Sequence, residues 1–313
     1  MQPISTERYC AGILSGTDAF AHVIGRNSGN AAARRVSTFD SGKSRSSKEP
    51  LAMPRRQIGF VEALWRYPVK SLRGESLSEA QVVEGGVAGD RVWALRELDR
   101  GGIMSARTWA AMLELRAVWS GDPTTAADAH VCIELPDGRM ICADDTESSS
   151  ILSDLFRRKI RLERIRAERI TPEELEAVMR GEAFPPKRDF FDEDVMHIIA
   201  SGTLAHLRTL RPDSDFDPRR FRANIYVDTG DEAGGFLEDQ WLNGVLEIGE
   251  TVRIGGMRPS IRCAITTHAQ SELPRDVAIL RTAWQHHQAY VGVFASVAVP
   301  GKIRVGDQVM LAL

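Results

Sequence analysis

Apolar and polar residues alternate in short runs from Ile58 onward, and glycine, proline or aspartate separates one run from the next. A period of two places successive side chains on opposite faces of an extended chain, so these runs predict β-strands. Two segments each predict a pair of strands joined by a turn: QVVEGGVAGDRVWALREL and HVCIELPDGRMICAD. Many short strands with turn residues between them are typical of a β-barrel or a β-sandwich.

The second half of the chain adds a few helices to this pattern. VMHIIA predicts a buried strand, and the residues after it predict a helix that Ser201 or Thr203 caps and Pro212 stops. A capping box predicts another helix from Thr171 to Gly181. Strand patterns then continue in RFRANIYVD, GVLEIGETVRIGG, IRCAITTH, YVGVFASVAV and KIRVGDQVMLAL. The predicted fold class is therefore mainly β with a few helices (α+β).

Composition divides the chain into three parts. Residues 1–55 are rich in serine, arginine and glycine without apolar periodicity, and residues 1–52 hold seven Lys or Arg against four Asp or Glu. Such a composition predicts a disordered N-terminal extension. The strand patterns occupy the rest of the chain, which is long enough for two domains, over residues 56–165 and 166–313.

The overall charge and hydropathy exclude two classes of partner. A net charge of -3 and a pI near 6.2 argue against a protein that binds nucleic acid through phosphate contacts. No apolar run approaches the roughly 20 residues that a membrane-spanning helix needs. The four cysteines show no CxxC spacing, which fits reduced thiols in a cytoplasmic protein.

Three of these cysteines attract attention for their neighbours. Cys132 and Cys142 flank the turn LPDGRM, which could bring them close together across a hairpin; we expect two reduced, partly buried thiols. Cys263 stands between Arg262 and a run of threonines. An adjacent cation favours a thiolate, and thiolates select soft metals, although a buried structural cysteine is the alternative.

Basic and hydroxyl residues form three further candidate constellations. If RFRANIYVD is one strand, its apolar side chains share one face and Arg220, Arg222, Asn224 and Tyr226 share the other. The turn into the helix that contains Thr203 could seat a phosphate at the helix N-terminus, or simply cap the helix. YPVKSLRGE and GVAGDR place Lys70, Ser71 and Arg91 near turns, where they could bind an anion or decorate a loop.

Taken in order, these stretches resemble the MOSC family, the molybdenum-cofactor sulfurase C-terminal type of domain, preceded by its N-terminal β-barrel partner. The resemblance covers residues from about Ile58 to Leu313. YPVKSLRG and GVAGDRVWAL look like the signatures of the N-terminal domain. RFRANIYVD, FLEDQW, EIGETVRI, IRCAITTH and KIRVGDQV look like successive signatures of the MOSC core. The resemblance therefore implies that a β-barrel MOSC domain follows the N-terminal one.

By pattern the chain is similar to two-domain enzymes such as the mitochondrial amidoxime-reducing component and its bacterial counterparts. This resemblance implies a molybdenum cofactor (Mo-molybdopterin) whose metal Cys263 coordinates. It further implies an oxidoreductase that removes oxygen from N-hydroxylated or related N-oxygenated small molecules. The cofactor-binding residues that it implies are Lys70, Ser71, Arg91, Thr203, Arg222, Asn224 and Arg262.

The sequence departs from its relatives at two places beside Cys263. Ile261 stands where many relatives have serine, and His268 and Ala269 replace a Val-Asp-Pro-type continuation. Some bacterial relatives carry a ferredoxin domain, but the cysteines here cannot supply a four-thiolate cluster. The resemblance thus implies a separate electron donor of ferredoxin, flavodoxin or reductase type. A persulfide sulfur carrier or transferase, and a non-catalytic carrier of the cofactor, remain alternatives.

Overall fold

The computed structural model describes residues 54–164, 196–230 and 234–313. These residues are mostly strands, with three α-helices and several short 3-10 helices among them. The mainly β fold class that the sequence predicts is confirmed. The helix predicted from Thr171 to Gly181 and nearly all of the predicted N-terminal extension lie outside the described residues.

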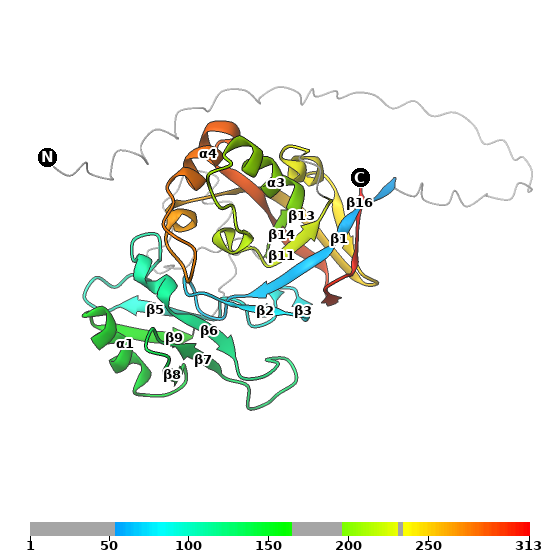
Figure 1. The fold of residues 1–313 in the computed structure, drawn as a ribbon. Coiled ribbons are helices and arrows are strands. Elements are labelled where there is room, and N and C mark those ends of the chain that lie inside the picture. Colours follow the sequence, from blue (N-terminus) through cyan, green and yellow to red (C-terminus); the bar gives the residue numbers. More distant parts are fainter. Residues whose placement is uncertain (1–53, 165–195, 231–233) are drawn as a thin grey trace, which may run out of the picture. The chain divides into compact units, whose positions relative to one another are not determined.

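Seven strands close into a barrel (Figure 1). All neighbouring pairs are antiparallel except β10 and β11, and β1 closes the barrel by pairing with both β11 and β16. A short strand, β2 (Glu75–Leu77), extends the sheet beyond β1. Around the barrel the strands are β11 (Ile225–Asp228), β10 (Met196–Ala200), β14 (Tyr290–Val299), β13 (Val252–Ile261), β12 (Val245–Ile248), β16 (Gln308–Ala312) and β1 (Arg55–Arg66).

The barrel interior is an apolar core that follows from the alternation along each strand. Ile225 and Val227 on β11 and Leu246 and Ile248 on β12 are fully buried in it. The long strand β1 bends through two register shifts, one of them next to Gly59. A Cβ atom at Gly59 would lie 1.9 Å from the carbonyl oxygen of Asp228, so only glycine lets the two strands approach there.

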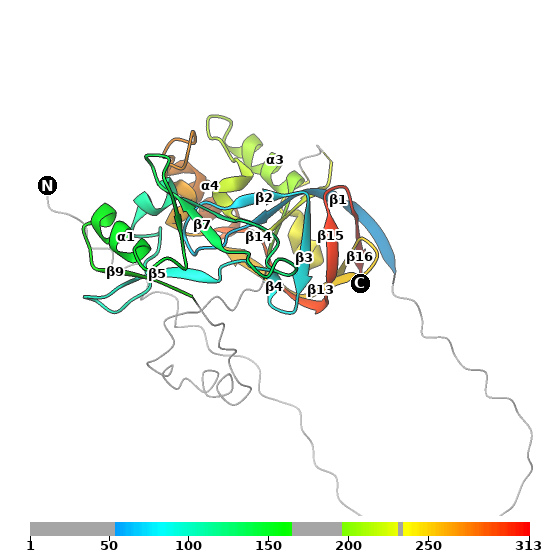
Figure 2. The same cartoon turned by 90° about the horizontal axis from the view of Figure 1, so that it is seen from below.

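Smaller sheets make up most of the region between β1 and residue 164. β5 (Trp93–Glu97) pairs with β9 (Ile160–Arg164), and β6 (Arg116–Trp119), β7 (Val131–Glu134) and β8 (Met140–Cys142) form a three-stranded sheet. Both sheets, α1 (Ser148–Phe156) and the 3-10 helix η2 (Ala110–Glu114) contribute to one apolar core. A third sheet joins β3 (Glu79–Val83) and β4 (Gly86–Val87) to β15 (Gly301–Arg304), as Figure 2 shows.

A third apolar core, which we call the outer core, lies on the outer side of the barrel wall. The helices α3 (Ser201–Leu210) and α4 (Ala278–His287) contribute Leu207 and Ile279 to it, and Tyr226 of β11 joins them. The strand VMHIIA and the helix after it are therefore confirmed as β10 and α3, but neither Ser201 nor Thr203 caps the helix, because its N-cap is Ala200 and no side chain makes a capping hydrogen bond. One further 3-10 helix, η4 (Leu237–Trp241), precedes β12.

The structure corrects the interpretation of RFRANIYVD as one strand. Asp217 accepts a hydrogen bond from the backbone N–H of Arg219 at 2.8 Å and caps a 3-10 helix, η3 (Pro218–Phe221). Arg222 is left-handed, and the strand begins only at Ile225. As a result the predicted polar face does not exist, and Tyr226, which we expected on it, is buried with Phe221 and Ala223 in the outer core.

The strand interpretation of IRCAITTH also needs correction. β13 ends at Ile261, and a 3-10 helix, η5 (Ala264–Thr267), begins after Cys263. Residues 52–313 form one compact unit, so the predicted division after residue 165 stays a prediction. Within the three described ranges, no helix has the length and apolar character needed to span a bilayer.

Candidate functional site

Cys263 lies in the turn between β13 and η5. Its thiol is free and partly exposed. The carbonyl oxygen of Cys263 accepts hydrogen bonds from the backbone N–H and the hydroxyl of Thr266, at 3.1 and 3.0 Å. The backbone N–H of Arg262 donates to the carbonyl of Ala289 at 2.8 Å. Hydrogen bonds on both sides therefore fix the backbone that presents the sulfur.

Arg262 places a buried cation beside this thiol. Its guanidinium donates to the carbonyl of Phe221 at 2.7 Å and to the hydroxyl of Ser260 at 2.5 Å. Burial lowers the pKa of Arg262 to about 10, and the neighbouring Cys263 opposes this shift. Burial and Arg262 hold the pKa of His197 well below its usual value, so this imidazole is neutral.

Arg222 is a second buried guanidinium close to the first. Its left-handed backbone (φ 56°) costs about 1 kcal/mol for a residue other than glycine. Nη1 donates to the carbonyl of Leu72 at 2.7 Å, and the guanidinium carbon lies 4.2 Å from the ring centre of Tyr67. Burial lowers the pKa of Arg222 to about 10. The loop at Leu72 thus holds a cation against an aromatic face.

Arg91 connects the N-terminal region to this cation. Its guanidinium donates to the carbonyl of Arg222 at 3.3 Å and to Oδ1 of Asn224 at 3.4 Å, and it also contacts the carboxylate of Asp90. It lies 5.2 Å from the ring centre of Tyr67. Burial raises the pKa of Tyr67 to about 12, so the ring is neutral between two guanidinium groups.

Asn224 is fully buried and its side chain serves the fold. Its Oδ1 accepts from the backbone N–H of His197 at 3.2 Å, and its Nδ2 donates to the carbonyl of Trp65 at 3.2 Å. These bonds link β1 to β10 beside Arg222. We therefore assign Asn224 a positioning role at the site.

Lys70 and Ser71 lie near the site because they are next to Leu72 in the sequence. They directly precede Leu72, whose carbonyl holds Arg222. Ser71 is buried and left-handed (φ 67°), and the backbone N–H of Lys70 donates to the carbonyl of Trp93 at 2.8 Å. The loop that carries both residues therefore lies against the Arg222 guanidinium.

A cavity of about 260 Å³ opens on one side of Arg222. Cys263 is not among the described residues that line it. Four arginines and two aromatic rings give this cavity the character of a site for an anion with a flat ring. Its lining consists of Trp65, Tyr67, Arg73, Gly74, Ser76, Arg116, Arg219, Arg222, Gln270, Ser271 and Leu273.

Three buried side-chain nitrogens lack a hydrogen-bond partner among the described residues: Nε of Arg73, Nη2 of Arg222 and Nε of Arg262. An unpaired buried donor costs about 1–3 kcal/mol, and a charged one costs more. Arg73 and Arg222 both line the cavity, so their two unpaired donors indicate that an anion can bind there.

Comparison with known families decides what kind of chain carries this site. The family described as the MOSC domain matches residues 185–310, and the family described as the MOSC N-terminal beta barrel domain matches residues 58–154. The chain belongs to the MOSC family. Its candidate site draws on both matched segments, because Arg91 and Leu72 lie in the first and Arg222, Arg262 and Cys263 lie in the second.

Two solved structures are similar to this MOSC chain. The YuaD protein from Bacillus subtilis is 13% identical, with 83% of this chain and 97% of that chain covered at a TM-score of 0.43. YiiM from Geobacillus stearothermophilus is 18% identical, with 39% of this chain and 56% of that chain covered at a TM-score of 0.28. No curated protein matches the chain.

The MOSC barrel separates Thr203 from the other predicted site residues. Asn224 and His197 meet near the start of β10, whereas Thr203 lies in α3 after the end of that strand. The strand alone separates His197 from Ala200 by roughly 10 Å. We therefore remove Thr203 from the candidate set of cofactor-binding residues.

The start of α3 already holds a carboxyl group that belongs to the protein. The carboxylate of Glu238 accepts from the backbone N–H of Ala200 at 2.8 Å and from the hydroxyl of Thr203. The backbone N–H of Gly202 is taken by the hydroxyl of Thr229 at 3.0 Å. Burial raises the pKa of Glu238, and these hydrogen bonds oppose that rise. This internal carboxylate occupies the place where the sequence suggested a phosphate.

Sequence reasoning missed part of the arginine cluster. Arg73 stands three residues after Lys70 in the same motif, so its position could have been noticed. Arg219 stands directly before the motif RFRANIYVD, whereas Arg116 comes from an unrelated segment that only the fold brings to the cavity. Arg219 is already paired with Asp217 at 2.8 Å and Glu272 at 2.6 Å, which leaves Arg222 and Arg73 as the cavity arginines with unpaired donors.

Proposed function

We propose that this chain is a molybdenum-cofactor-dependent oxidoreductase that reduces N-hydroxylated or related N-oxygenated substrates. The observation that supports this proposal best is the pair of unpaired buried guanidinium nitrogens, on Arg222 and Arg262, the second of which lies beside a partly exposed cysteine. One sulfur ligand and several cations suit a group that is both a soft metal centre and an anion.

The residues fit such a cofactor in three respects. Cys263 offers a sulfur ligand, and Arg262 places a cation beside it. Arg222 and Arg91 offer positive charge to a phosphate or pterin, with Tyr67 as a flat neutral surface between them. Lys70 and Ser71 would add an ammonium and a hydroxyl from the neighbouring loop. Because the guanidinium groups are buried, their attraction for an anion is little screened by salt.

The protein's own contribution would be to hold and orient the cofactor. The barrel fixes Asn224, the Leu72 carbonyl fixes Arg222 and η5 fixes the cysteine backbone, so little reorganisation is needed when an anion binds. When bound, the cofactor would supply the oxygen-removing redox chemistry, as cofactors generally do. Reduction of an N-hydroxyl group to N–H consumes two electrons and two protons and releases water.

The proposed reaction needs an electron donor. With Cys263 committed to the cofactor, the remaining three cysteines of the sequence are too few for a four-thiolate iron–sulfur cluster. We therefore assign the donor role to a separate protein of ferredoxin, flavodoxin or reductase type. A reducing compartment such as the cytoplasm would keep the Cys263 thiol free.

The test measures molybdenum per chain and turnover on the same samples. The full chain is produced in a host that makes the cofactor, as wild type, Cys263→Ser and the matched control Cys132→Ser. We expect wild type and Cys132→Ser to carry molybdenum and to reduce an aromatic amidoxime with a purified donor pair. Cys263→Ser should lose both. Reduction by Cys263→Ser at the wild-type rate would overturn the proposal.

A sulfur carrier is the second candidate function. The supporting observation is the same partly exposed thiol beside Arg262, since such a cysteine can also bear a persulfide. Intact-mass analysis separates the two functions: a chain without molybdenum that gains one sulfur atom at Cys263 supports the carrier. A chain that holds molybdenum but gives no turnover would support a non-catalytic cofactor carrier.

A further inference from the structure

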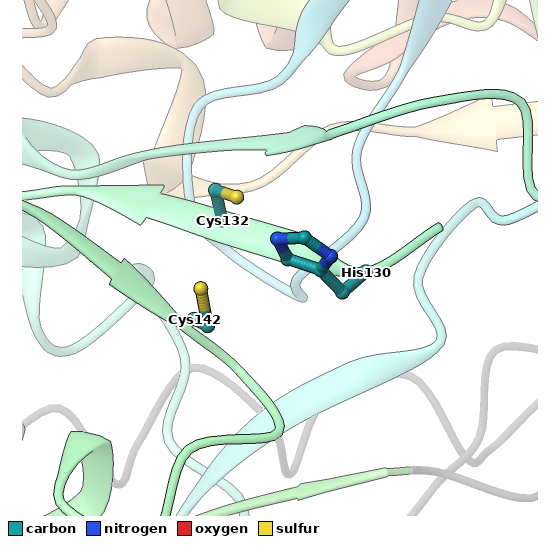
Figure 3. A group of neighbouring side chains, drawn as sticks. All are labelled: His130, Cys132 and Cys142. Atoms are coloured by element: carbon teal, nitrogen blue, oxygen red, sulfur yellow. The ribbon is translucent and has the colours of Figure 1, made fainter. Parts of the chain in front are cut away.

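A second sulfur-containing cluster lies away from Cys263, on the three-stranded sheet. The hairpin of β7 and β8 places Cys132 directly opposite Cys142, and His130 lies just before β7 (Figure 3). All three side chains are partly buried, and their ligand atoms lie within 4.8 Å of one another. The nearness of the two cysteines that the turn LPDGRM predicted is thus confirmed.

The hydrogen-bond register makes the two cysteines close neighbours. Val131 and Ala143 form one hydrogen-bonded position of the hairpin, with the N–H of Ala143 donating at 2.7 Å, and Leu135 and Arg139 form another at 2.9 Å. Since the two kinds of position alternate, Cys132 and Cys142 form a non-hydrogen-bonded pair, in which Cα atoms lie only about 4.5 Å apart. Both sulfurs therefore leave the sheet on one face.

His130 is oriented as a metal-binding histidine usually is. Two residues before Cys132, it shares the same face of the strand. Its Nδ1 lies 3.1 Å from the carbonyl of Asp128 and 3.2 Å from the hydroxyl of Ser120. Donation from Nδ1 to a carbonyl leaves Nε2 as the lone-pair nitrogen. Figure 3 shows that this nitrogen, the one farther from the backbone, points toward the two sulfurs.

The spacing of the three ligand atoms suits a soft cation with tetrahedral coordination. With Zn–S near 2.3 Å and Zn–N near 2.0 Å, a tetrahedral site needs sulfurs about 3.8 Å apart and nitrogen about 3.5 Å from each. Ligand atoms within 4.8 Å of one another need only small side-chain rotations to reach this geometry. A disulfide would use the two sulfurs but would give the oriented imidazole no role.

We propose that His130, Cys132 and Cys142 bind one soft divalent cation, zinc being the natural occupant, with the fourth position open to water. Metal binding to a thiol releases its proton, so a bound cation would hold both sulfurs as thiolate ligands.

Cobalt titration tests the site in the untagged full chain, under reducing conditions and in a Cys263→Ser background. Cobalt is a spectroscopic probe of thiolate ligands, and zinc should displace it with one-to-one stoichiometry. Cys132→Ser and Cys142→Ser should weaken zinc binding by about 100-fold, and His130→Gln by about tenfold. His286→Gln, on the exposed end of α4, is the matched control and should bind as wild type does.

A second measurement needs no variant at the site. In the Cys263→Ser protein, zinc should slow alkylation of Cys132 and Cys142, as peptide mass analysis reports, and a chelator should restore it. Two results would overturn the proposal: cobalt without any sulfur-to-metal absorption, or a Cys132–Cys142 disulfide that forms in place of metal binding when zinc is supplied.

Discussion

The two thiol sites of this chain differ in what surrounds the sulfur. Cys263 is a single sulfur beside Arg262, with Arg222 and Arg91 close by. Cys132 and Cys142 are two sulfurs beside an imidazole. A sulfur among buried cations attracts a metal that arrives inside an anionic group, whereas two sulfurs repel each other as thiolates and attract a bare cation. The charge around a cysteine, more than the cysteine itself, decides which metal species it accepts.

The two sites also differ in how the chain builds them. The cysteine pair rests on one hairpin, so local register alone positions it. The arginine site needs β1, β10 and β11 of the barrel together with the loop at Leu72. A local site should tolerate damage to the barrel better than a site assembled from distant segments.

Exchanging the two sites' cysteines for serine should give the largest effects. Cys263→Ser should abolish molybdenum-dependent turnover by at least about 100-fold, because loss of a metal ligand exceeds the 10- to 100-fold cost of outer-shell changes. Zinc affinity should stay at the wild-type value. Cys142→Ser should show the reverse pattern. Elemental analysis of both metals on the same preparations checks this, and loss of both metals in either variant would contradict two independent sites.

Removing the Asn224 side chain should destabilise the barrel that underlies the arginine site. Asn224→Ala leaves the His197 N–H and the Trp65 carbonyl without their partner, which should cost about 2–4 kcal/mol in the free energy of unfolding. Urea unfolding measures this cost. Asn243→Ala, at an exposed turn position, is the control and should change stability by less than about 0.5 kcal/mol. Equal losses in the two variants would argue against a positioning role.

Neutralising one buried guanidinium should weaken binding of the cofactor, although the cysteine that would bind its metal remains. Arg222→Gln deletes the cation and its unpaired donor, so molybdenum per folded chain should fall by about tenfold under limiting cofactor, near 1.4 kcal/mol. Arg253→Gln is the control, since that arginine pairs with Glu247 on the barrel surface. Unchanged molybdenum in Arg222→Gln would show that the cysteine alone determines binding.

The smallest expected effect is the contribution of His197 to the pH dependence of stability. His197, next to Arg262, has a lowered pKa in the folded state, so below pH 6.5 the unfolded chain gains a proton that the fold excludes. Stability should therefore fall as the pH drops below this value, by at most about 1.4 kcal/mol per pH unit from this group. In His197→Gln the fall between pH 6.5 and 5.5 should be shallower. His286→Gln should keep the wild-type slope in the same unfolding experiment, and identical slopes in all three proteins would refute the assignment.

The sequence predicted those parts of the fold that depend on local alternation. The hairpin carrying Cys132 and Cys142, the buried strand β10 and the helix α3 all appear where the pattern placed them. Prediction failed where a short polar residue overrode alternation. Asp217 and Pro218 start a 3-10 helix just before the apparent strand, and this helix runs into it until the left-handed Arg222 ends it, so period-two reasoning assigned the wrong faces.

The sequence predicted which residues belong to the candidate site, but it did not predict how they contact one another. The motifs named Cys263, Arg262, Arg222 and Arg91, which the fold connects through backbone carbonyls at Phe221, Arg222 and Leu72. Hydrogen bonds to backbone carbonyls cannot be predicted from a pattern of side chains along the sequence. Thr203 shows the converse, because its helix start looked open to a phosphate until Glu238, 35 residues later, supplied a carboxylate.

The position of β16 has a consequence for how the protein is made. This strand lies between β12 and β1, and β1 is the first strand of the barrel along the chain. During synthesis, β1 leaves the ribosome long before its neighbour β16 exists, so the cylinder cannot shut until translation of that last strand is complete. Pairing over such a sequence separation is slow. Nascent chains should thus depend on chaperones that shield the waiting edge of β1.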